Sequence, residues 1–354
     1  MLTRSDASLT IVVMLHIGAA LEYRGGYMMR FARWLALTAV LLCAAQPAMV
    51  QPTLAQDYPN KLIRILVGVV PGGGADLVAR DIATRLQDTW GQSVIVENRG
   101  GANGTVATAA LAKSPPDGYT LMLTLSSHIT NPMMYSNLSY DVNKDIVPVS
   151  LVSAAPLVMV ANPKFEVSDV KSLIALAKQK PGEVHYSTPG TGSIHHLSME
   201  LLNSLSGIKL VQVPYRGGGP SVTDVIGNQI PMTISSTVQI LQLVQNKTLK
   251  PLAVTSAKRT DVLPDVPTFA EQGVGGYESE LWFGLIAPAG TPAAVVTKIN
   301  REVDRIVQSP DMRQRIASQG ARPIGGTPQE FAAYLDREQV KWATIFKEIS
   351  IKPE

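Results

Sequence analysis

Hydrophobic residues recur at two spacings along this chain, every second position in some segments and every third or fourth position in others. Residues 63–69 place β-branched side chains at alternate positions and are followed by Pro71, a pattern that predicts a buried strand ending at a turn. The next apolar residues have helical spacing and predict a helix that begins near Asp76. The apolar stripe of that helix consists of Leu77, Ala79, Ile82, Ala83 and Leu86.

The same succession of strand and helix continues through the chain. Further strands are predicted at residues 94–97, 119–125, 151–162, 184–187, 210–213, 232–235, 249–255 and 277–288. Further helices are predicted at residues 105–113, 168–180, 194–206, 220–226, 292–308, 310–319 and 328–347. Alternating elements of this kind are typical of the α/β class, in which helices flank a mostly parallel sheet and ligands bind at the carboxyl ends of the strands.

Two apolar segments are expected to divide these elements between two lobes. Residues 156–161 and 282–287 are the predicted crossing strands. The first lobe would then comprise residues 57–156 together with residues 282–354, and the second lobe would comprise residues 157–281. Two crossings form a hinge, and a hinge lets two lobes close around a ligand.

Two loops that join a strand to a helix have the composition of an anion site. The first loop and the start of its helix contain Gly72, Gly73, Gly74, Ala75 and Asp76. The second loop contains Thr188, Gly190, Thr191 and Ser193. Glycine has no Cβ, so these loops can take positive φ and admit a ligand close to the backbone. Unpaired N–H groups at a helix N-terminus, together with the helix macrodipole, attract an anion.

The spacing of these glycines excludes nucleotide motifs. Neither loop matches G-x-G-x-x-G or G-x-x-x-x-G-K-[ST], and no lysine lies in them. A third glycine loop at residues 215–219 carries Arg216, which could pair with a ligand carboxylate. Ser193 lies at the start of the helix that follows the second glycine loop. Its side chain can cap backbone N–H groups or donate its hydroxyl to a carboxylate. Polar residues at strand ends complete the candidate ligand-binding site: Ser126, Ser127, His128, Ser235 and Ser236.

Two histidines, His195 and His196, lie in the first turn of the helix that follows Ser193. A helix N-terminus disfavours protonated histidine, so we expect these two side chains to be neutral donors or packing groups, with His195 in the candidate site. Adjacent histidines point in different directions around a helix, and no carboxylate lies at metal-ligand spacing, so no metal or cofactor is expected. An enzyme using Ser193 and His195 is the remote alternative, although the G-x-S-x-G motif is absent.

The N-terminal residues predict export from the cytoplasm. Two arginines precede a 12-residue apolar run at 34–45, and small residues offer a signal-peptidase site after Ala55. The expected signal peptide is 28–55, residues 1–27 are an upstream extension, and the mature protein is expected in the periplasm. An uncleaved anchor is the alternative, but the apolar run is shorter than the roughly 20 residues that span a bilayer.

Composition narrows the partners of the mature chain. Cys43 is the single cysteine and lies within the expected signal peptide, so no disulfide or cysteine metal site is expected. Residues 1–55 hold four of the 31 basic and two of the 28 acidic residues, which leaves 27 against 26. This near-neutral balance argues against a nucleic-acid partner. We expect a soluble monomer.

Several segments in the same order resemble one family. They are PGGGAD at 71–76, VENRGGANG at 96–104, STPGTGSIHHL at 187–197, VPYRGGGPSVTDVIGNQI at 213–230 and WFGLIAPAGTP at 282–292. These residues are similar to the Bug family of TctC-like extracytoplasmic solute receptors of tripartite tricarboxylate transporters. The resemblance implies a two-lobed, type II-like periplasmic binding fold that closes over a small carboxylated solute and passes it to membrane subunits. It also implies that the loops 71–76 and 188–193 grip one carboxylate through backbone N–H groups and water.

The chain departs from the family pattern at one wall of the pocket. The aromatic residue of relatives falls on Val69, and Ser235 and Ser236 stand where relatives often have Asp or Asn, so the ligand itself is not carried over. Trp282, in the extended run before the closing helices, joins the candidate site. A subunit that senses the same solute and reports to a membrane kinase is the alternative to transport. Neighbouring genes for membrane transport subunits would distinguish the two functions.

Overall fold

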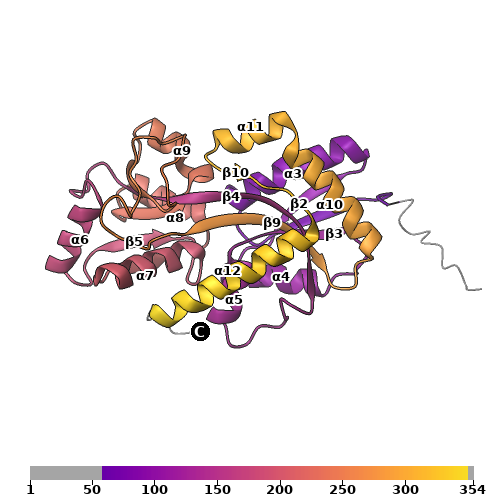
Figure 1. Cartoon of the computed structure of the whole chain (residues 1–354), viewed down its shortest axis with the longest axis horizontal. Coiled ribbons are helices and arrows are strands. Elements are labelled where there is room, and N and C mark those ends of the chain that lie inside the picture. Colours follow the sequence, from indigo (N-terminus) through magenta and orange to yellow (C-terminus); the bar gives the residue numbers. More distant parts are fainter. Residues whose placement is uncertain (1–57, 350–354) are drawn as a thin grey trace, which may run out of the picture. The chain divides into compact units, whose positions relative to one another are not determined.

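The strands of this protein pair into one continuous sheet (Figure 1). The computed structural model describes residues 58–349, so the predictions for the upstream extension, the signal peptide and Cys43 lie outside the described residues. The strands of the described part are β1 (Ile63–Val67), β2 (Val94–Asn98), β3 (Thr120–Leu125), β4 (Ile146–Ala161), β5 (His185–Thr188), β6 (Val211–Pro214), β7 (Met232–Ser236), β8 (Lys250–Val254), β9 (Glu280–Pro288) and β10 (Arg322–Pro323). Their order is β2-β1-β3-β9-β4-β7-β5-β6, and β8 and β10 also pair with β4.

The helices lie close to the positions that the hydrophobic pattern predicts. They are α3 (Gly74–Trp90), α4 (Thr105–Ala112), α5 (Ser127–Met134), α6 (Val170–Gln179), α7 (Ile194–Ser206), α8 (Gly218–Ile226), α9 (Thr237–Gln245), α10 (Ala293–Gln308), α11 (Pro310–Ser318) and α12 (Pro328–Glu348), with a short 3-10 turn η2 (Ala102–Gly104) before α4. Two of these helices, α5 and α9, and the short strand β10 are absent from the sequence prediction. Helix α5 has only eight residues and contains Pro132, so its sequence has the composition of a loop.

Strand β4 connects two groups of strands because its two parts have different partners. Residues 146–156 pair antiparallel with β9, whereas residues 157–161 pair antiparallel with β7. We call β1, β2, β3, β9, β10 and the first part of β4 lobe 1. Lobe 2 consists of β5, β6, β7, β8 and the second part of β4. Figure 1 shows β4 and β9 side by side in the middle of the sheet.

The parallel strands in each lobe point their carboxyl ends at the loops that matter for binding. Strand β1 pairs parallel with β2 and β3, and β5 pairs parallel with β6 and β7. Strands β1 and β3 lead directly into α3 and α5, and β5, β6 and β7 lead into α7, α8 and α9. Five strand ends therefore deliver five helix N-termini to the region between the lobes, as expected for an α/β fold.

The second crossing lies earlier in the chain than the sequence predicts. Strand β9 already pairs with the lobe 1 part of β4 from Glu280 onwards, while the N–H of Ser279 donates to the carbonyl of Thr255 in lobe 2 at 3.2 Å. The chain therefore crosses between residues 279 and 280. Residues 282–287 belong to lobe 1, because the apolar run of β9 is the buried centre of that half of the sheet and not a linker.

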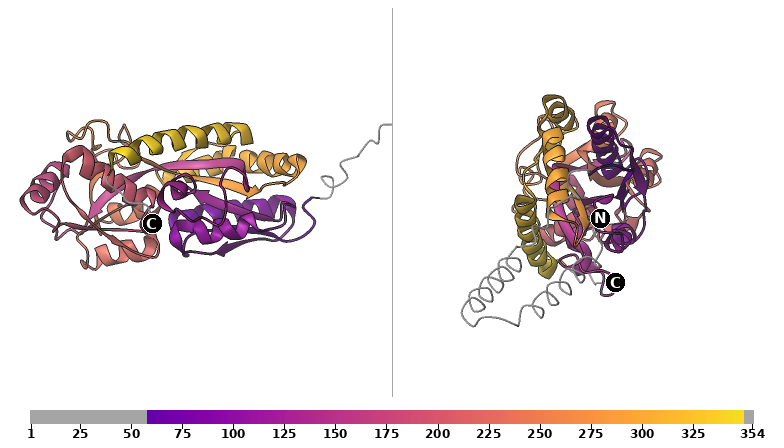
Figure 2. Two further views of the ribbon diagram at one scale, coloured as in Figure 1. Left: turned by 90° about the horizontal axis from the view of Figure 1, so that it is seen from below. Right: turned by 90° about the vertical axis from the view of Figure 1, so that its right-hand side faces the viewer.

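Helix α12 packs on elements of both lobes, although the sequence places it in lobe 1. It packs along β4 and contacts α5 of lobe 1 and α7 of lobe 2. The left view of Figure 2 shows α12, in yellow, lying along β4. Its apolar face reaches Trp282, whose ring centroid lies 5.7 Å from that of Phe331 in an edge-on arrangement. Trp282, Phe331 and Trp342 are completely buried, so α12 seals the outer face of the hinge strands.

Candidate functional site

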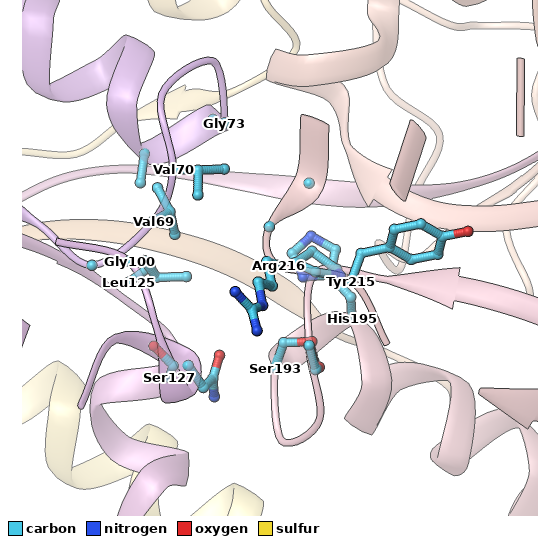
Figure 3. Close-up of a pocket in the computed structure, with 18 of the residues that line it drawn as sticks. Val69, Val70, Gly73, Gly100, Leu125, Ser127, Ser193, His195, Tyr215 and Arg216 are labelled. Carbon is cyan, nitrogen blue, oxygen red and sulfur yellow. Dashed lines mark hydrogen bonds between the residues drawn. The ribbon is translucent and has the colours of Figure 1, made fainter. Parts of the chain in front are cut away.

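A pocket of about 640 Å³ lies between the loops of the two lobes (Figure 3). Lobe 1 contributes Gly68, Val69, Val70, Gly73, Gly74, Ala75, Gly100, Gly101, Ala102, Asn103, Leu125, Ser127, Tyr135, Leu281 and Phe283. Lobe 2 contributes Pro189, Gly190, Thr191, Ser193, His195, Tyr215, Arg216, Gly217, Gly218, Ser236 and Gln239. The pocket thus brings together most of the residues proposed from the sequence: Val69, Gly73, Gly74, Ala75, Ser127, Gly190, Thr191, Ser193, His195, Arg216 and Ser236.

The first glycine loop places the N-terminus of α3 at this pocket. Gly72 has φ +85°, whereas Gly73 is the extended N-cap residue at φ −77° and Gly74 begins the helix. Positive φ is therefore confined to one of the three glycines of this run. The N–H groups of Gly74 and Ala75 find no protein acceptor among the described residues, as is usual in a first helical turn.

The carboxylate of Asp76 is hydrogen-bonded to this loop on the side away from the pocket and does not line the pocket. It accepts hydrogen bonds from the N–H of Gly72 at 3.0 Å, from Nε of Arg80 at 3.0 Å and from Nδ2 of Asn98 at 2.9 Å. Burial of the Asp76 carboxyl opposes ionisation, but the hydrogen bonds from these three donors outweigh it and lower its pKa. Because Gly72 donates to Asp76, the structure places both of these residues in the loop scaffold, outside the pocket lining.

The second glycine loop delivers the N-terminus of α7 from lobe 2. Ser193 is its N-cap: Oγ accepts from the N–H of His196 at 3.3 Å and donates to the carbonyl of Gly190 at 2.7 Å. The Ser193 hydroxyl proton is thus already used within the loop, so the structure supports its capping role and not donation to a carboxylate. The N–H groups of Ile194 and His195 find no protein acceptor in the described part of the chain. Thr188 accepts from Gln212 at 2.6 Å and lies outside the pocket lining.

Three buried histidines surround the site but differ in where they point. Burial lowers the pKa of His128, His195 and His196 to about 4, so all three are neutral at pH 7. His195 lines the pocket, and His196 accepts from the N–H of Gly192 at Nδ1 at 3.2 Å. His128 instead lines a separate cavity of about 120 Å³ between α5 and α12, because consecutive residues project from different sides of a helix and Ser127 takes the pocket side.

The third glycine loop carries Arg216 into the pocket. The N–H groups of Tyr215 and Gly217 donate to the carbonyls of Thr188 and Pro189, both at 2.9 Å, and fix the loop on either side of Arg216. Figure 3 shows the Arg216 side chain extending between Ser127 of lobe 1 and Ser193 of lobe 2. Its guanidinium makes no hydrogen bond or ion pair with any described residue.

Three other residues proposed from the sequence lie outside the pocket lining: Ser126 and Ser235 at strand ends, and Trp282 in the extended run. Ser126 accepts from the N–H of Trp282 at 3.1 Å and so ties β3 to β9. Ser235 donates to Oε1 of Gln239 at 3.2 Å. Trp282 points away from the pocket into the α12 interface, because side chains alternate along β9 and its neighbours Leu281 and Phe283 face the pocket. The sequence cannot indicate which face of β9 lines the pocket and which packs against α12, since β9 is buried on both faces.

Several pocket residues were missed in the sequence, although one signal was available. The loop NRGGANG of residues 98–104 contributes Gly100, Gly101, Ala102 and Asn103, and like the other glycine loops it lies between a strand and a helix. Its glycine content was the signal that could have assigned it. Tyr135 and Gln239 come from α5 and α9, the two helices that the pattern did not predict.

Neither a metal centre nor a membrane-spanning helix is found in residues 58–349. No three His, Cys, Asp or Glu side chains in this range are grouped so that they could hold a metal ion. No helix in the same range is long and apolar enough to cross a membrane.

The fold and the pocket define a two-lobed solute-binding protein, and comparison with known proteins gives the family. Residues 78–351 match the model of the tripartite tricarboxylate transporter family receptor, TctC. The chain is 36% identical over 326 residues to protein BugT of Bordetella pertussis, a match that covers 92% of this chain and 99% of that protein. This chain therefore belongs to the TctC, or Bug, family of solute receptors.

Solved structures agree with this assignment. Rpa4515 of R. palustris with adipate has a TM-score of 0.82 and 34% identity, covering 84% of this chain and all 100% of that one. MatC from Rhodopseudomonas palustris with bound malate has a TM-score of 0.78 and 29% identity, covering 81% of this chain and 99% of that one. The family resemblance, the two-lobed α/β fold and the prediction of a receptor instead of an enzyme are confirmed.

Proposed function

We propose that this protein is a periplasmic receptor that captures a small carboxylate between its lobes and delivers it to the membrane subunits of a tripartite tricarboxylate-type transporter. Two relatives support the ligand class, because Rpa4515 was solved with adipate and MatC with malate, and both ligands are carboxylates. The family description supports delivery to a transporter.

One observation carries the proposal: helix N-termini with unpartnered N–H groups face the pocket from both lobes. Gly74 and Ala75 of α3 supply them from lobe 1, and Ile194 and His195 of α7 supply them from lobe 2. Each N-terminus carries the equivalent of about half a positive charge and binds anions well. A carboxylate that accepts from both would tie the lobes together, so binding and closure become one event.

The proposed ligand contacts are the pocket residues already described, and the proposed division of lobes follows the strand pairing. The change of partner in β4 between residues 156 and 157 supports residues 57–156 as the first part of lobe 1. The same pairing supports residues 157–281 as lobe 2, except that residues 280 and 281 already pair with lobe 1. It also supports residues 282–354 as the closing part of lobe 1.

A thermal-shift screen tests the ligand class. The ligand-stripped protein is heated with small mono- and dicarboxylates, including aromatic ones, and with the corresponding primary amides. Binding to the folded state adds about 2.7 kcal/mol to stability at 100 times the dissociation constant, which gives a visible rise in Tm. We expect acids and not amides to raise the Tm. A complete lack of response to carboxylates would contradict the proposed ligand class.

Transport requires its own experiment. Deleting the gene should reduce uptake of the ligand found in the screen at submicromolar supply, and a plasmid copy should restore uptake. Unchanged uptake together with a lost transcriptional response to the ligand would contradict delivery to a transporter and identify a sensor.

Mass spectrometry of the periplasmic fraction should find a mature chain that starts near Gln56.

A further inference from the structure

Gly192 is the point at which the second glycine loop of lobe 2 touches lobe 1. Oγ1 of Thr130, on α5, donates to the carbonyl oxygen of Gly192 at 3.3 Å. Gly192 has φ +74°, and a Cβ added to it would lie 2.9 Å from Cγ of Met134, also on α5. Glycine therefore suits this position twice, because it allows the positive φ and leaves room for the neighbouring helix. Thr130 and Met134 are both completely buried, so lobe 1 covers the loop tightly here.

The direction of the Gly192 carbonyl is set by the peptide that it shares with Ser193. In a planar trans peptide, the C=O of one residue and the N–H of the next point in opposite directions. The N–H of Ser193 donates to the carbonyl of Gly190 at 3.3 Å and so points into its own loop. The Gly192 carbonyl consequently points out of the loop, where Thr130 of the other lobe reaches it.

His196 fixes the peptide on the other side of Gly192. Its Nδ1 accepts a hydrogen bond from the N–H of Gly192 at 3.2 Å, and the ring is neutral at pH 7 because burial lowers the pKa of His196 to about 4. A neutral imidazole that accepts at Nδ1 carries its proton on Nε2, which lies 3.8 Å from Oε1 of Glu200. Turning the ring over would place a carbon atom against Gly192, and the bond would be lost. The two peptides that flank Gly192 are thus both held, one by Gly190 and one by His196.

His196 lies outside the lining of the pocket, which distinguishes it from His195. Any effect of His196 on ligand binding must therefore pass through the loop that it holds. The contact between Thr130 and Gly192 exists while the lobes lie together and is broken when they separate, so it favours the first arrangement whether or not a ligand is bound. A ligand then needs less of its own binding energy to bring the lobes together.

We propose that His196 is a positioning residue that presents the Gly192 carbonyl to Thr130, and that this contact favours adjacent lobes before a ligand arrives. The proposal rests on the proposed function, in which the lobes close around a ligand. It adds a contribution to closure that comes from the protein and not from the ligand.

The distance between the lobes tests this proposal without any ligand. Cys43 is the single cysteine and lies in the expected signal peptide, so two introduced cysteines can be spin-labelled specifically in the exported, ligand-stripped protein. Val106→Cys on α4 and Thr223→Cys on α8 place one exposed label on each lobe. Double electron–electron resonance then gives the populations of adjacent and separated lobes. We expect adjacent lobes to predominate in the parent protein.

Removal of one hydroxyl group tests the contact itself. Thr130→Val keeps the shape of the side chain and should raise the ratio of separated to adjacent lobes about two- to tenfold, the change expected for one neutral hydrogen bond. Thr130→Ser restores a hydroxyl and should restore most of the parent ratio. Thr108→Val is the matched control, because the buried hydroxyl of Thr108 donates to the Gly104 carbonyl at 3.1 Å within lobe 1. It should leave the ratio unchanged.

A double-variant cycle tests whether His196 acts through the same contact. His196→Leu should raise the ratio as Thr130→Val does, and His196→Asn, whose amide oxygen can accept from Gly192, should restore part of it. Combining His196→Leu with Thr130→Val should add little to either change alone, because both break one contact. Nitrogen NMR of the parent protein should show the His196 proton on Nε2. The Tm of each variant confirms that it folds.

Each outcome decides the proposal. A ratio that rises in Thr130→Val and keeps the parent value in Thr108→Val, with non-additive effects at His196, supports it. Mostly separated lobes in the parent protein, an unchanged ratio in Thr130→Val, additive effects of the two changes, or a proton on Nδ1 overturns it. Thr130→Val and the NMR measurement decide it even where His196→Leu fails to fold. None of these results depends on a carboxylate, so the thermal-shift screen judges the proposed function separately.

Discussion

At the scale of single residues, the protein separates charges that hold the structure from charges that meet the ligand. Asp76 lies directly behind the anion-binding turn of α3, where a free carboxylate would repel an incoming acid. Its oxygens instead accept from Gly72, Arg80 and Asn98, and Asn98 also donates to the carbonyl of Val69 at 3.0 Å. The carboxylate therefore shapes the loop while Arg80 balances its charge, and the pocket keeps a positive potential from backbone N–H groups and Arg216.

Replacing Asp76 with alanine should destabilise the folded protein. The change removes two part-buried hydrogen bonds, from the N–H of Gly72 and from Nδ2 of Asn98, and each such bond contributes about 0.5–1.5 kcal/mol to stability. Urea denaturation followed by circular dichroism measures the change in the free energy of unfolding. Asp88→Ala is the control, because Asp88 is exposed on the same helix and should change stability by less than about 0.5 kcal/mol. Equal effects of the two variants would show that the Asp76 network does not stabilise the loop.

At the scale of elements, glycines mark the places where the two lobes touch. Gly192 of lobe 2 lies against Met134 of α5, where a Cβ would come to 2.9 Å, and its carbonyl accepts from Oγ1 of Thr130 at 3.3 Å. Gly74 at the start of α3 faces the end of β7, where a Cβ would lie 3.1 Å from Oγ of Ser236. Separating the lobes would relieve these contacts.

Gly74→Ala should weaken ligand binding without harming the fold. Gly74 has helical φ, and alanine is favoured over glycine in a helix by up to about 1 kcal/mol, so the Tm of the ligand-free protein should stay the same or rise. Closure would force the new methyl group against Ser236, a cost of about 1 kcal/mol or more in binding. Calorimetry on Gly74→Ala, Ser236→Ala and the double variant gives the coupling between the two sites. Additive effects would mean that the lobes do not approach this closely in the bound state.

The elements also show what the sequence could and could not predict. The spacing of hydrophobic residues predicts β1, α3, β5 and α7, and therefore also the two glycine loops between them. It does so because a half-buried helix, and a glycine run between a strand and a helix, can both be recognised from neighbouring residues alone. The orientation of β9 depends on what packs against each face, so the sequence alone places Trp282 at the pocket, whereas in the structure it packs against α12. Helix α5 depends on tertiary contacts that override Pro132, and the different fates of Ser127 and His128 follow from that helix alone.

At the scale of the whole molecule, the long strand β4 makes two lobes share one sheet. Its 16 residues are buried almost throughout, and α12 packs along it while touching a helix of each lobe. We expect closure to come from bending near the change of pairing at residues 156 and 157, since the sheet on either side is held by β9 and β7.

The stability of the whole molecule should fall on mild acidification. Burial holds the pKa of His128, His195 and His196 at about 4 in the folded state, below the unfolded value of about 6.5. Between these two values the unfolded chain binds more protons, so the free energy of unfolding decreases as the pH falls through that window. Urea denaturation at pH 7.5 and 5.5 should show a loss of about 1 kcal/mol for each histidine.

A variant assigns part of that pH dependence. His128→Gln should reduce the loss between pH 7.5 and 5.5 by about 1 kcal/mol, because it removes one of the three buried imidazoles. Stability that is flat across this range in the parent protein would show that the histidines are not held neutral by burial.

The central claim is that backbone N–H groups from both lobes hold a carboxylate, and one calorimetric titration tests it most directly. The best acid from the thermal screen and its primary amide, which has the same shape and no charge, are titrated into the ligand-stripped protein at pH 7.5. The acid should bind at least about tenfold tighter than the amide, since one or two charge-assisted hydrogen bonds of roughly 1.5–3 kcal/mol each are lost with the charge. Equal affinities for acid and amide would contradict the claim.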